Sequence, residues 1–177
     1  MAETGQVIRN PVTGETTKFL VTSADSGGKL LQIEMTADPK APGATEHLHP
    51  RITEKYEMLE GTLHVLMNGK DHAVAAGERL EIPQGTPHSF WNADDERARV
   101  RVNFEPAGRF EYFMEKIYAL AADGKTNAKS RPKNLLQAAV IGQAYLNDIA
   151  LAKPPLAVQR VFYAVLAPIG RLFGYRA

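Results

Sequence analysis

The alternation of short apolar runs and turns over residues 18–105 limits this chain more than any other feature of its sequence. Residues 99–104 alternate strictly, with Val100, Val102 and Phe104 on one face, which is the period of a half-buried strand. Asn68-Gly69 is a strong hairpin signal between two such runs. Many short strands separated by turns predict an all-β sandwich or barrel. The expected strands include Lys18–Thr22, Leu30–Thr36, Thr62–Met67, Arg79–Pro83 and Arg99–Phe104.

After Pro106 the spacing of apolar residues changes from the period of a strand to that of a helix. We therefore predict a mainly β protein with two parts, a barrel over residues 1–106 and a helical extension over residues 107–177. The extension is expected to pack on the barrel or on a second subunit. The predicted helices are Phe110–Ala122, Leu135–Leu151 and Val158–Leu166, the last interrupted near Pro168 and resuming through Arg171–Phe173.

The 177 residues include no cysteine, which excludes a cysteine–zinc site, a thiol nucleophile and a structural disulfide. The first ten residues contain two charges and no apolar segment, so they do not form a secretory signal peptide. No run approaches the 18 uncharged apolar residues of a membrane-spanning helix. These observations predict a soluble, cytoplasmic protein.

The charge is unevenly distributed along the chain. Residues 1–105 carry 11 Lys and Arg against 16 Asp and Glu, a net of −5, whereas residues 106–177 carry 10 against 4, a net of +6. The simpler interpretation is that the basic segment packs against the acidic one; the alternative is contact with anionic lipid or nucleic acid. The basic residues are scattered and no DNA-reading helix-turn-helix is recognisable, so we expect neither a nucleic acid nor a membrane partner.

Four side chains in the strand-rich part have the spacing and chemistry of a metal site. His47 and His49 lie two residues apart, which in a strand places both imidazoles on one face. Glu54 follows after a short loop, and His88 comes from a later strand. Three neutral imidazoles and one carboxylate suit a single divalent ion of Fe, Mn, Ni, Co, Cu or Zn. The residues leave open which of these ions is bound.

The same residues carry a resemblance to a known family. The stretch His47-x-His49-x4-Glu54-x6-Gly61 resembles the first motif of the cupin superfamily, and Gly77-x5-Pro83-x-Gly85-x2-His88-x3-Asn92 matches the second. The resemblance covers residues 18–105, and the whole chain is similar to bacterial single-cupin proteins with a helical C-terminal extension. It implies a double-stranded β-helix, or jelly-roll barrel, of the RmlC-like type.

The first motif differs from the family pattern at one position. The family usually has glycine six residues before the first histidine, where this chain has Ala41, and the nearest glycine is Gly43. The loop that enters the site is therefore expected to differ in shape. Small barrels of this family commonly associate, and an open barrel edge needs cover, so a homodimer is expected.

Strand parity predicts which side chains surround the metal. If Glu54 points into the barrel, alternate residues of its strand point inward as well, and the same holds for His88. The expected pocket is therefore apolar and aromatic, which favours a hydrophobic or aromatic ligand. The predicted pocket residues are Tyr56, Met58, Met67, Phe90 and Phe104.

Three classes of function remain open for such a site. A metal-dependent oxygenase, similar to single-cupin dioxygenases, would act on a small apolar or aromatic oxygenated substrate. Glu54 would stay a ligand or, on dissociating, act as the catalytic residue that takes a proton from a substrate hydroxyl. An isomerase, epimerase or lyase would use the metal as a Lewis acid. A small-molecule sensor would bind without turnover. A phosphosugar substrate is disfavoured, because Arg97, Arg99 and Arg101 fall on the outward face of their strand.

Overall fold

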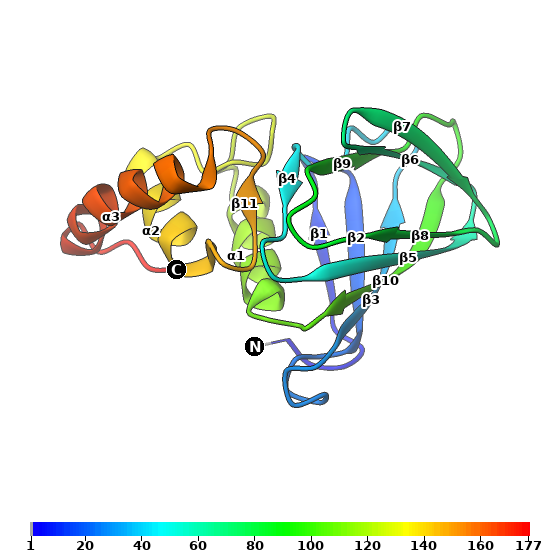
Figure 1. The fold of residues 1–177 in the computed structure, drawn as a ribbon, viewed down its shortest axis with the longest axis horizontal. Coiled ribbons are helices and arrows are strands. Elements are labelled where there is room, and N and C mark those ends of the chain that lie inside the picture. The colour runs from blue at the N-terminus through cyan, green and yellow to red at the C-terminus, as the bar shows by residue number, and fades with distance from the viewer. Residues whose placement is uncertain (1) are drawn as a thin grey trace.

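The computed structural model describes residues 2–177 and places two antiparallel sheets face to face. The sheets form a barrel, and the helices lie together at one end of it (Figure 1). The predicted mainly β fold with a C-terminal helical segment is confirmed. The first sheet has the order β1 (Val7–Asn10), β2 (Glu15–Val21), β3 (Leu31–Ala37), β10 (Ala98–Glu105), β5 (Thr53–Glu60), β8 (Arg79–Ile82). The second has the order β11 (Ala150–Leu151), β4 (His47–Leu48), β9 (His88–Trp91), β6 (Thr62–Met67), β7 (Lys70–Ala75).

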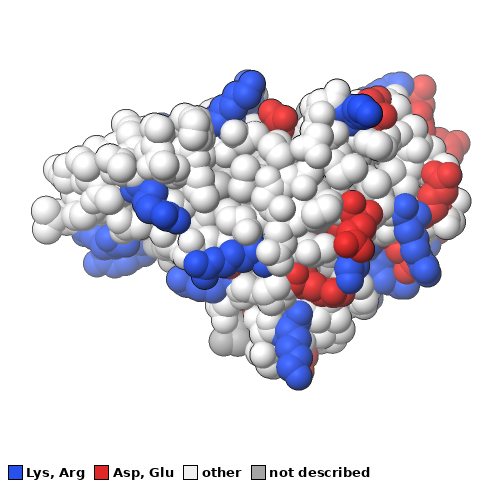
Figure 2. Space-filling model, viewed as in Figure 1, with Lys and Arg blue, Asp and Glu red and all other residues white. Residues whose placement is uncertain are grey.

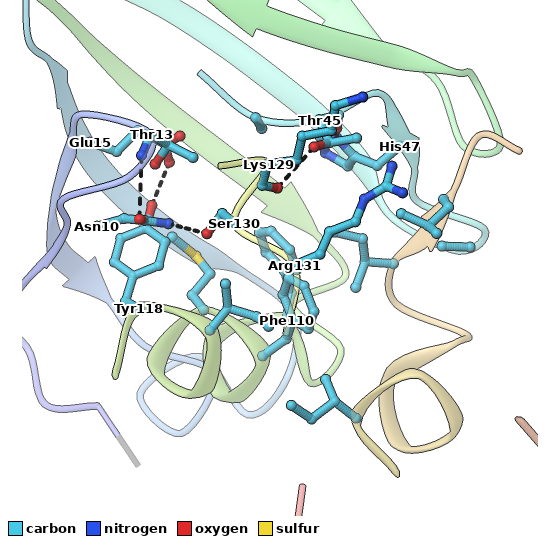
Figure 3. A pocket seen from close by; sticks show the side chains of 18 of the residues that line it. Asn10, Thr13, Glu15, Thr45, His47, Phe110, Tyr118, Lys129, Ser130 and Arg131 are labelled. Carbon is cyan, nitrogen blue, oxygen red and sulfur yellow. Dashed lines mark hydrogen bonds between the residues drawn. The ribbon is translucent and has the colours of Figure 1, made fainter. Parts of the chain in front are cut away.

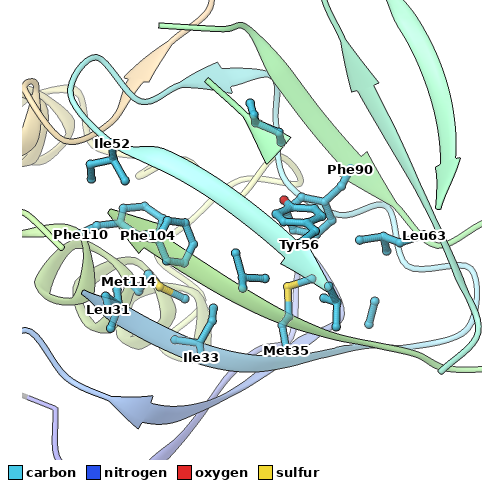
Figure 4. Packing of buried hydrophobic residues seen from close by; sticks show 14 of the residues in the cluster. Leu31, Ile33, Met35, Ile52, Tyr56, Leu63, Phe90, Phe104, Phe110 and Met114 are labelled. Atoms are coloured by element: carbon cyan, nitrogen blue, oxygen red, sulfur yellow. The ribbon is translucent and has the colours of Figure 1, made fainter. Parts of the chain in front are cut away.

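Alternating side chains of the strands fill the space between the sheets. On β10, every second residue from Ala98 to Phe104 is buried, as the period-2 pattern predicts. The aromatic ring of Phe104 packs against Phe110 of α1 (Phe110–Ala122), with ring centroids 4.6 Å apart. Figure 4 shows how Met114 of the same helix joins this cluster beside the strands. Helix α1 therefore closes one end of the barrel with its apolar face.

The structure corrects the second predicted helix. Helix α2 spans Leu135–Tyr145 and ends six residues before the expected boundary. Residues 150–151 form strand β11, which pairs antiparallel with β4, so that Leu151 lies opposite His47. A helix through these residues would leave the outer edge of β4 without hydrogen-bond partners, and strand pairing supplies them. The helical extension therefore contributes a strand to the barrel sheet.

Two further predicted boundaries are wrong. Strand β2 begins at Glu15 rather than Lys18, because its pairing with β3 continues to Ala37. Helix α3 (Leu156–Leu172) continues through Pro168 without the expected interruption. Proline removes the hydrogen bond to the carbonyl four residues earlier, at Ala164. Both residues are exposed, so water can satisfy that carbonyl.

Helix α3 packs on α2 and meets the barrel sheet at β11, where Gln159 Nε2 donates a hydrogen bond to the carbonyl of Leu151. Two glycines permit the close approach: a Cβ on Gly142 would lie 2.5 Å from the ring of Tyr163, and one on Gly170 would lie 2.7 Å from Val140. An apolar stripe of α3 faces away from α2 and is exposed. Its exposed large hydrophobic residues are Val158, Val161, Phe162, Val165 and Ile169, followed by Leu172 and Phe173.

This exposed face is concentrated and sparsely charged. It holds seven of the nine large hydrophobic side chains that are exposed in residues 2–177. Figure 2 shows the helical end as mostly uncharged with scattered Lys and Arg, while the acidic side chains gather over the barrel. No helix within residues 2–177 is long and apolar enough to cross a membrane. An apolar surface of this kind marks an interface.

We propose that a second copy of the chain covers this face of α3. The only charged residues within the helix are Arg160 and Arg171, which is fewer cations than interfacial membrane helices usually carry. Two identical apolar faces can meet across a twofold axis without unpaired charges at the centre.

We expect Val161→Glu to convert a dimer into single chains, because the carboxylate would be desolvated in the interface. Light scattering at micromolar concentration measures the mass. The matched control is Val7→Glu, since Val7 is 57% exposed on the barrel and Val161 is 66% exposed on α3. A wild-type mass of one chain would contradict the dimer, and flotation of the full chain with anionic liposomes would assign the face to lipid.

Candidate metal centre

Three of the four predicted ligands lie on strands of the two sheets, the fourth directly follows one, and all four meet inside the barrel. His47 and His88 lie directly opposite each other in the pairing of β4 with β9. His49 follows β4, and Glu54 lies on β5 in the facing sheet. All four side chains are buried, and one potential ligand atom from each lies within 4.8 Å of the others. The fold therefore gathers side chains separated by up to 41 positions into one cluster.

Backbone carbonyls orient the three imidazoles. The Nδ1 atoms of His47 and His88 lie 2.8 Å and 2.9 Å from the carbonyls of Thr45 and Thr86. The Nδ1 atom of His49 lies 2.6 Å from the carbonyl of Asp148. Because a carbonyl oxygen only accepts, each Nδ1 must carry the proton. Each Nε2 is left with a lone pair, which is the form that binds a metal.

The atoms that face the centre lack protein partners. His49 Nε2, His88 Nε2 and Glu54 Oε2 are buried and form no hydrogen bond within the described chain. Glu54 Oε2 lies 2.9 Å from His88 Nε2 and 3.6 Å from His49 Nε2. Buried polar atoms rarely remain unsatisfied, and several lone pairs converging on one point are what a cation requires. The residues present therefore fit a divalent metal ion.

The electrostatics of the cluster favour neutral imidazoles at His47 and His49 and an ionised carboxylate at Glu54. Burial lowers the pKa of both His47 and His49, and the neighbouring His88 lowers each further. Burial works to raise the pKa of Glu54, but the adjacent His88 and His49 outweigh it and lower that pKa. Burial likewise works to lower the pKa of His88, while the Glu54 carboxylate prevails and raises it. Two neutral imidazoles therefore stand beside an ionised carboxylate.

A cavity of about 230 Å³ adjoins the cluster, with His47 and Glu54 in its wall. Three of the five predicted pocket residues, Tyr56, Phe90 and Phe104, line it. Met58 and Met67 are not among the lining residues. Met58 is fully buried in the core farther along β5, and Met67 is partly buried against the core. Most of the remaining wall is also apolar, so the cavity has the predicted character.

Sequence reasoning missed the residues that close the cavity on the helical side. Helix α1 contributes Phe110 and Tyr118, and the loop before α2 contributes Lys129, Ser130 and Arg131 (Figure 3). Two hydrogen bonds hold this loop: Asn10 Nδ2 donates to Ser130 Oγ at 2.8 Å, and Thr45 Oγ1 donates to the carbonyl of Lys129 at 3.0 Å. The sequence around residues 129–131 has the composition of an ordinary polar linker, so it did not indicate that these residues line a cavity.

Comparisons with known proteins agree with this geometry. Residues 33–104 match the family model for a cupin domain. The quercetin 2,3-dioxygenase of Bacillus subtilis (strain 168) is 27% identical over 77 residues, which cover 44% of this chain and 23% of that protein. The tetracenomycin polyketide synthase protein TcmJ of Streptomyces glaucescens is 33% identical over 98 residues, covering 52% of this chain and 62% of that protein.

A solved RmlC-like cupin from Shewanella frigidimarina superposes with a TM-score of 0.51 at 20% identity, covering 63% of this chain and 92% of that one. The chain spans less than two thirds of the length of the curated relatives it matches. The facing sheets, the two sequence motifs and the matched family model together identify the chain as a cupin-domain protein with a helical C-terminal segment.

Proposed function

We propose that this protein binds one divalent transition metal ion through His47, His49, Glu54 and His88 and oxygenates a small, oxygenated aromatic substrate with O2. The observation that carries the proposal is the position of the cluster in the wall of an apolar, aromatic cavity. Four protein ligands leave one or two coordination positions for other molecules on an ion of this kind. Because His47 and Glu54 both line the cavity, an ion that they held would border the space open to a substrate.

When bound, the ion would polarise a substrate oxygen and, if redox-active, activate O2. Glu54 would either stay a ligand or, on dissociating, take the proton of the substrate hydroxyl on its freed carboxylate oxygen. The substrate is oxidised and O2 is reduced, with both oxygen atoms entering the product. Tyr56, Phe90 and Phe104 would hold the aromatic body and exclude water.

The arginines of β10 supply no phosphate-binding group inside the barrel. Arg99 pairs with Glu34 and Glu60, and Arg101 pairs with Glu57 on the same sheet. Neither of these arginines lines the cavity, whose cationic lining residues are Lys129 and Arg131 of the loop before α2. The relative named for quercetin, an oxygenated aromatic molecule, points to the same substrate class.

A second candidate function is Lewis-acid catalysis without O2, as in an isomerase, epimerase or lyase. The observation in its favour is the similarity to a protein named for polyketide synthesis. Binding without turnover, as in a sensor, is the third. The same experiment separates all three.

We expect protein loaded with Fe, Mn, Ni, Co or Cu to consume O2 with quercetin as the first probe, and to incorporate label from ¹⁸O2. Glu54→Gln should reduce the rate by about 100-fold or more, because the amide is not a base. Glu57→Gln is the matched control, since Glu57 lies on the same strand but points outward toward Arg79. Turnover without O2 uptake would favour the Lewis-acid function, and binding without turnover would favour the sensor.

A further inference from the structure

A second polar cluster lines the same cavity at a distance from the metal centre. It consists of Glu15 on β2, Thr13 just before that strand, and Tyr118 on α1, and we refer to it as the Glu15 cluster. Figure 3 shows it on the opposite side of the cavity from His47. Glu15 and Tyr118 are 5% and 6% exposed, so the cluster is almost fully buried. No role in the proposed metal chemistry uses these side chains.

The hydrogen bonds of the cluster are incomplete. The Tyr118 hydroxyl donates to Glu15 Oε2 at 2.5 Å, which satisfies one carboxyl oxygen. Glu15 Oε1 forms no hydrogen bond within the described chain, and neither does Thr13 Oγ1. An unsatisfied buried polar atom costs about 1–3 kcal/mol. A polar group of a ligand in the cavity could satisfy Oε1, since Glu15 is part of the cavity wall.

The Glu15 carboxyl group also has no cationic partner. None of the ion pairs among residues 2–177 includes Glu15. Burial raises the pKa of Glu15, and this outweighs the opposite effect of the hydrogen bond from the Tyr118 hydroxyl. A carboxylic acid that keeps its proton both donates and accepts hydrogen bonds. A hydroxyl group of a ligand also donates and accepts hydrogen bonds, so it is a suitable partner for a protonated carboxyl group.

We propose that Glu15, with Thr13, binds a hydroxyl group at the end of the ligand remote from the metal centre. The ligand class is then an aromatic molecule with oxygen substituents at two separated positions, one for each end of the cavity. This inference rests on one part of the proposed function, namely that an aromatic ligand binds in this cavity. Glu15 would act as a specificity residue, because a ligand that lacks the second hydroxyl leaves Oε1 unpaired.

Binding to zinc-loaded, full-length protein tests this without any oxygen chemistry, since zinc has no redox activity. The probes are 2-naphthol and its 2,6- and 2,7-dihydroxy analogues, which differ from it only by the second hydroxyl. We expect the wild type to bind one of the diols at least about tenfold more tightly than 2-naphthol. In the double variant Glu15→Leu/Tyr118→Phe this ratio should fall to near one, and Glu15→Gln should retain most of it.

The controls separate a loss of specificity from a loss of fold. Zinc content should stay unchanged in every variant, since none of the substituted residues belongs to the metal cluster. Equal ratios in wild type and double variant would reduce the Glu15–Tyr118 contact to a structural tie and overturn the proposal. A wild-type ratio near one, or no binding of any probe, would overturn it even if the double variant did not fold. A preserved ratio without O2 consumption would reject the oxygenase alone.

Discussion

His49→Ala protein should contain only a small fraction of the metal that the wild type holds after metal-supplemented growth. The substitution removes one of three imidazole ligands and leaves a cavity beside Glu54, which lies 3.6 Å from His49 Nε2. Mutating a residue that only hydrogen-bonds to a metal ligand typically reduces metal affinity about 10- to 100-fold. Removing a ligand itself should reduce metal affinity at least as much. Elemental analysis should give near-stoichiometric metal in the wild type only.

His64→Ala is the matched control for this loss. His64 lies on β6 near the surface, with Nδ1 3.0 Å from Asp71 Oδ2 and its ring stacked on Trp91. Its removal should leave the metal content unchanged. A chelator should lower the melting temperature of the wild type but not of His49→Ala, because a bound metal stabilises only the folded state. Equal metal in wild type and His49→Ala would exclude the site.

Gly43→Ala should destabilise the protein by about 3 kcal/mol or more, which corresponds to a decrease in melting temperature of about 6–12 °C. Gly43 has a φ of +64°, and a Cβ built on it would lie 1.8 Å from the carbonyl oxygen of Phe90. The three atoms nearest to that Cβ are the carbonyl oxygen and carbon of Phe90 and the Cα of Trp91. All of them are backbone atoms, so they cannot move aside as a side chain could. The substitution should shift the loop away from β9, the strand that carries His88. Thermal or denaturant unfolding measures the effect.

Gly27→Ala is the control for the backbone conformation alone. Gly27 has nearly the same φ, +62°, but nothing lies within 4 Å of a Cβ at that position. We expect a cost of about 1 kcal/mol there, which is the strain of the left-handed conformation without the collision. Similar costs for the two substitutions would mean that the loop does not approach β9 as closely as described.

The metal cluster was predictable because side-chain chemistry and strand parity are both visible in the sequence. His47-x-His49 fixes two imidazoles on one face, and the motifs name Glu54 and His88 as their partners. The structure brings these four together. The position of Gly43 was visible too, as a glycine displaced by two positions. Its close approach to Phe90 was not, because β9 lies more than 40 residues farther along the chain.

The contribution of the C-terminal segment to the site could not be predicted. The group that orients His49 is the backbone carbonyl of Asp148, and every residue type carries such a carbonyl. Strand β11 was predicted as helix, because Ala150 and Leu151 are apolar and continue a helical run. Only the free edge of β4 makes strand pairing the better arrangement there. Glu15 was overlooked for a related reason: its inward position depends on β2 continuing to the register of Ala37.

The sequence by itself determined the mainly β fold, the change to helices after Pro106 and the metal-ligating residue types, because periodicity and side-chain chemistry are local properties. The tertiary structure decided which surfaces meet. It joined the extension to the barrel through β11, placed the Glu15 cluster in the cavity wall, and turned the apolar face of α3 outward. The glycines that let α3 approach α2 act only through partners distant in the chain, and no local pattern specifies such partners.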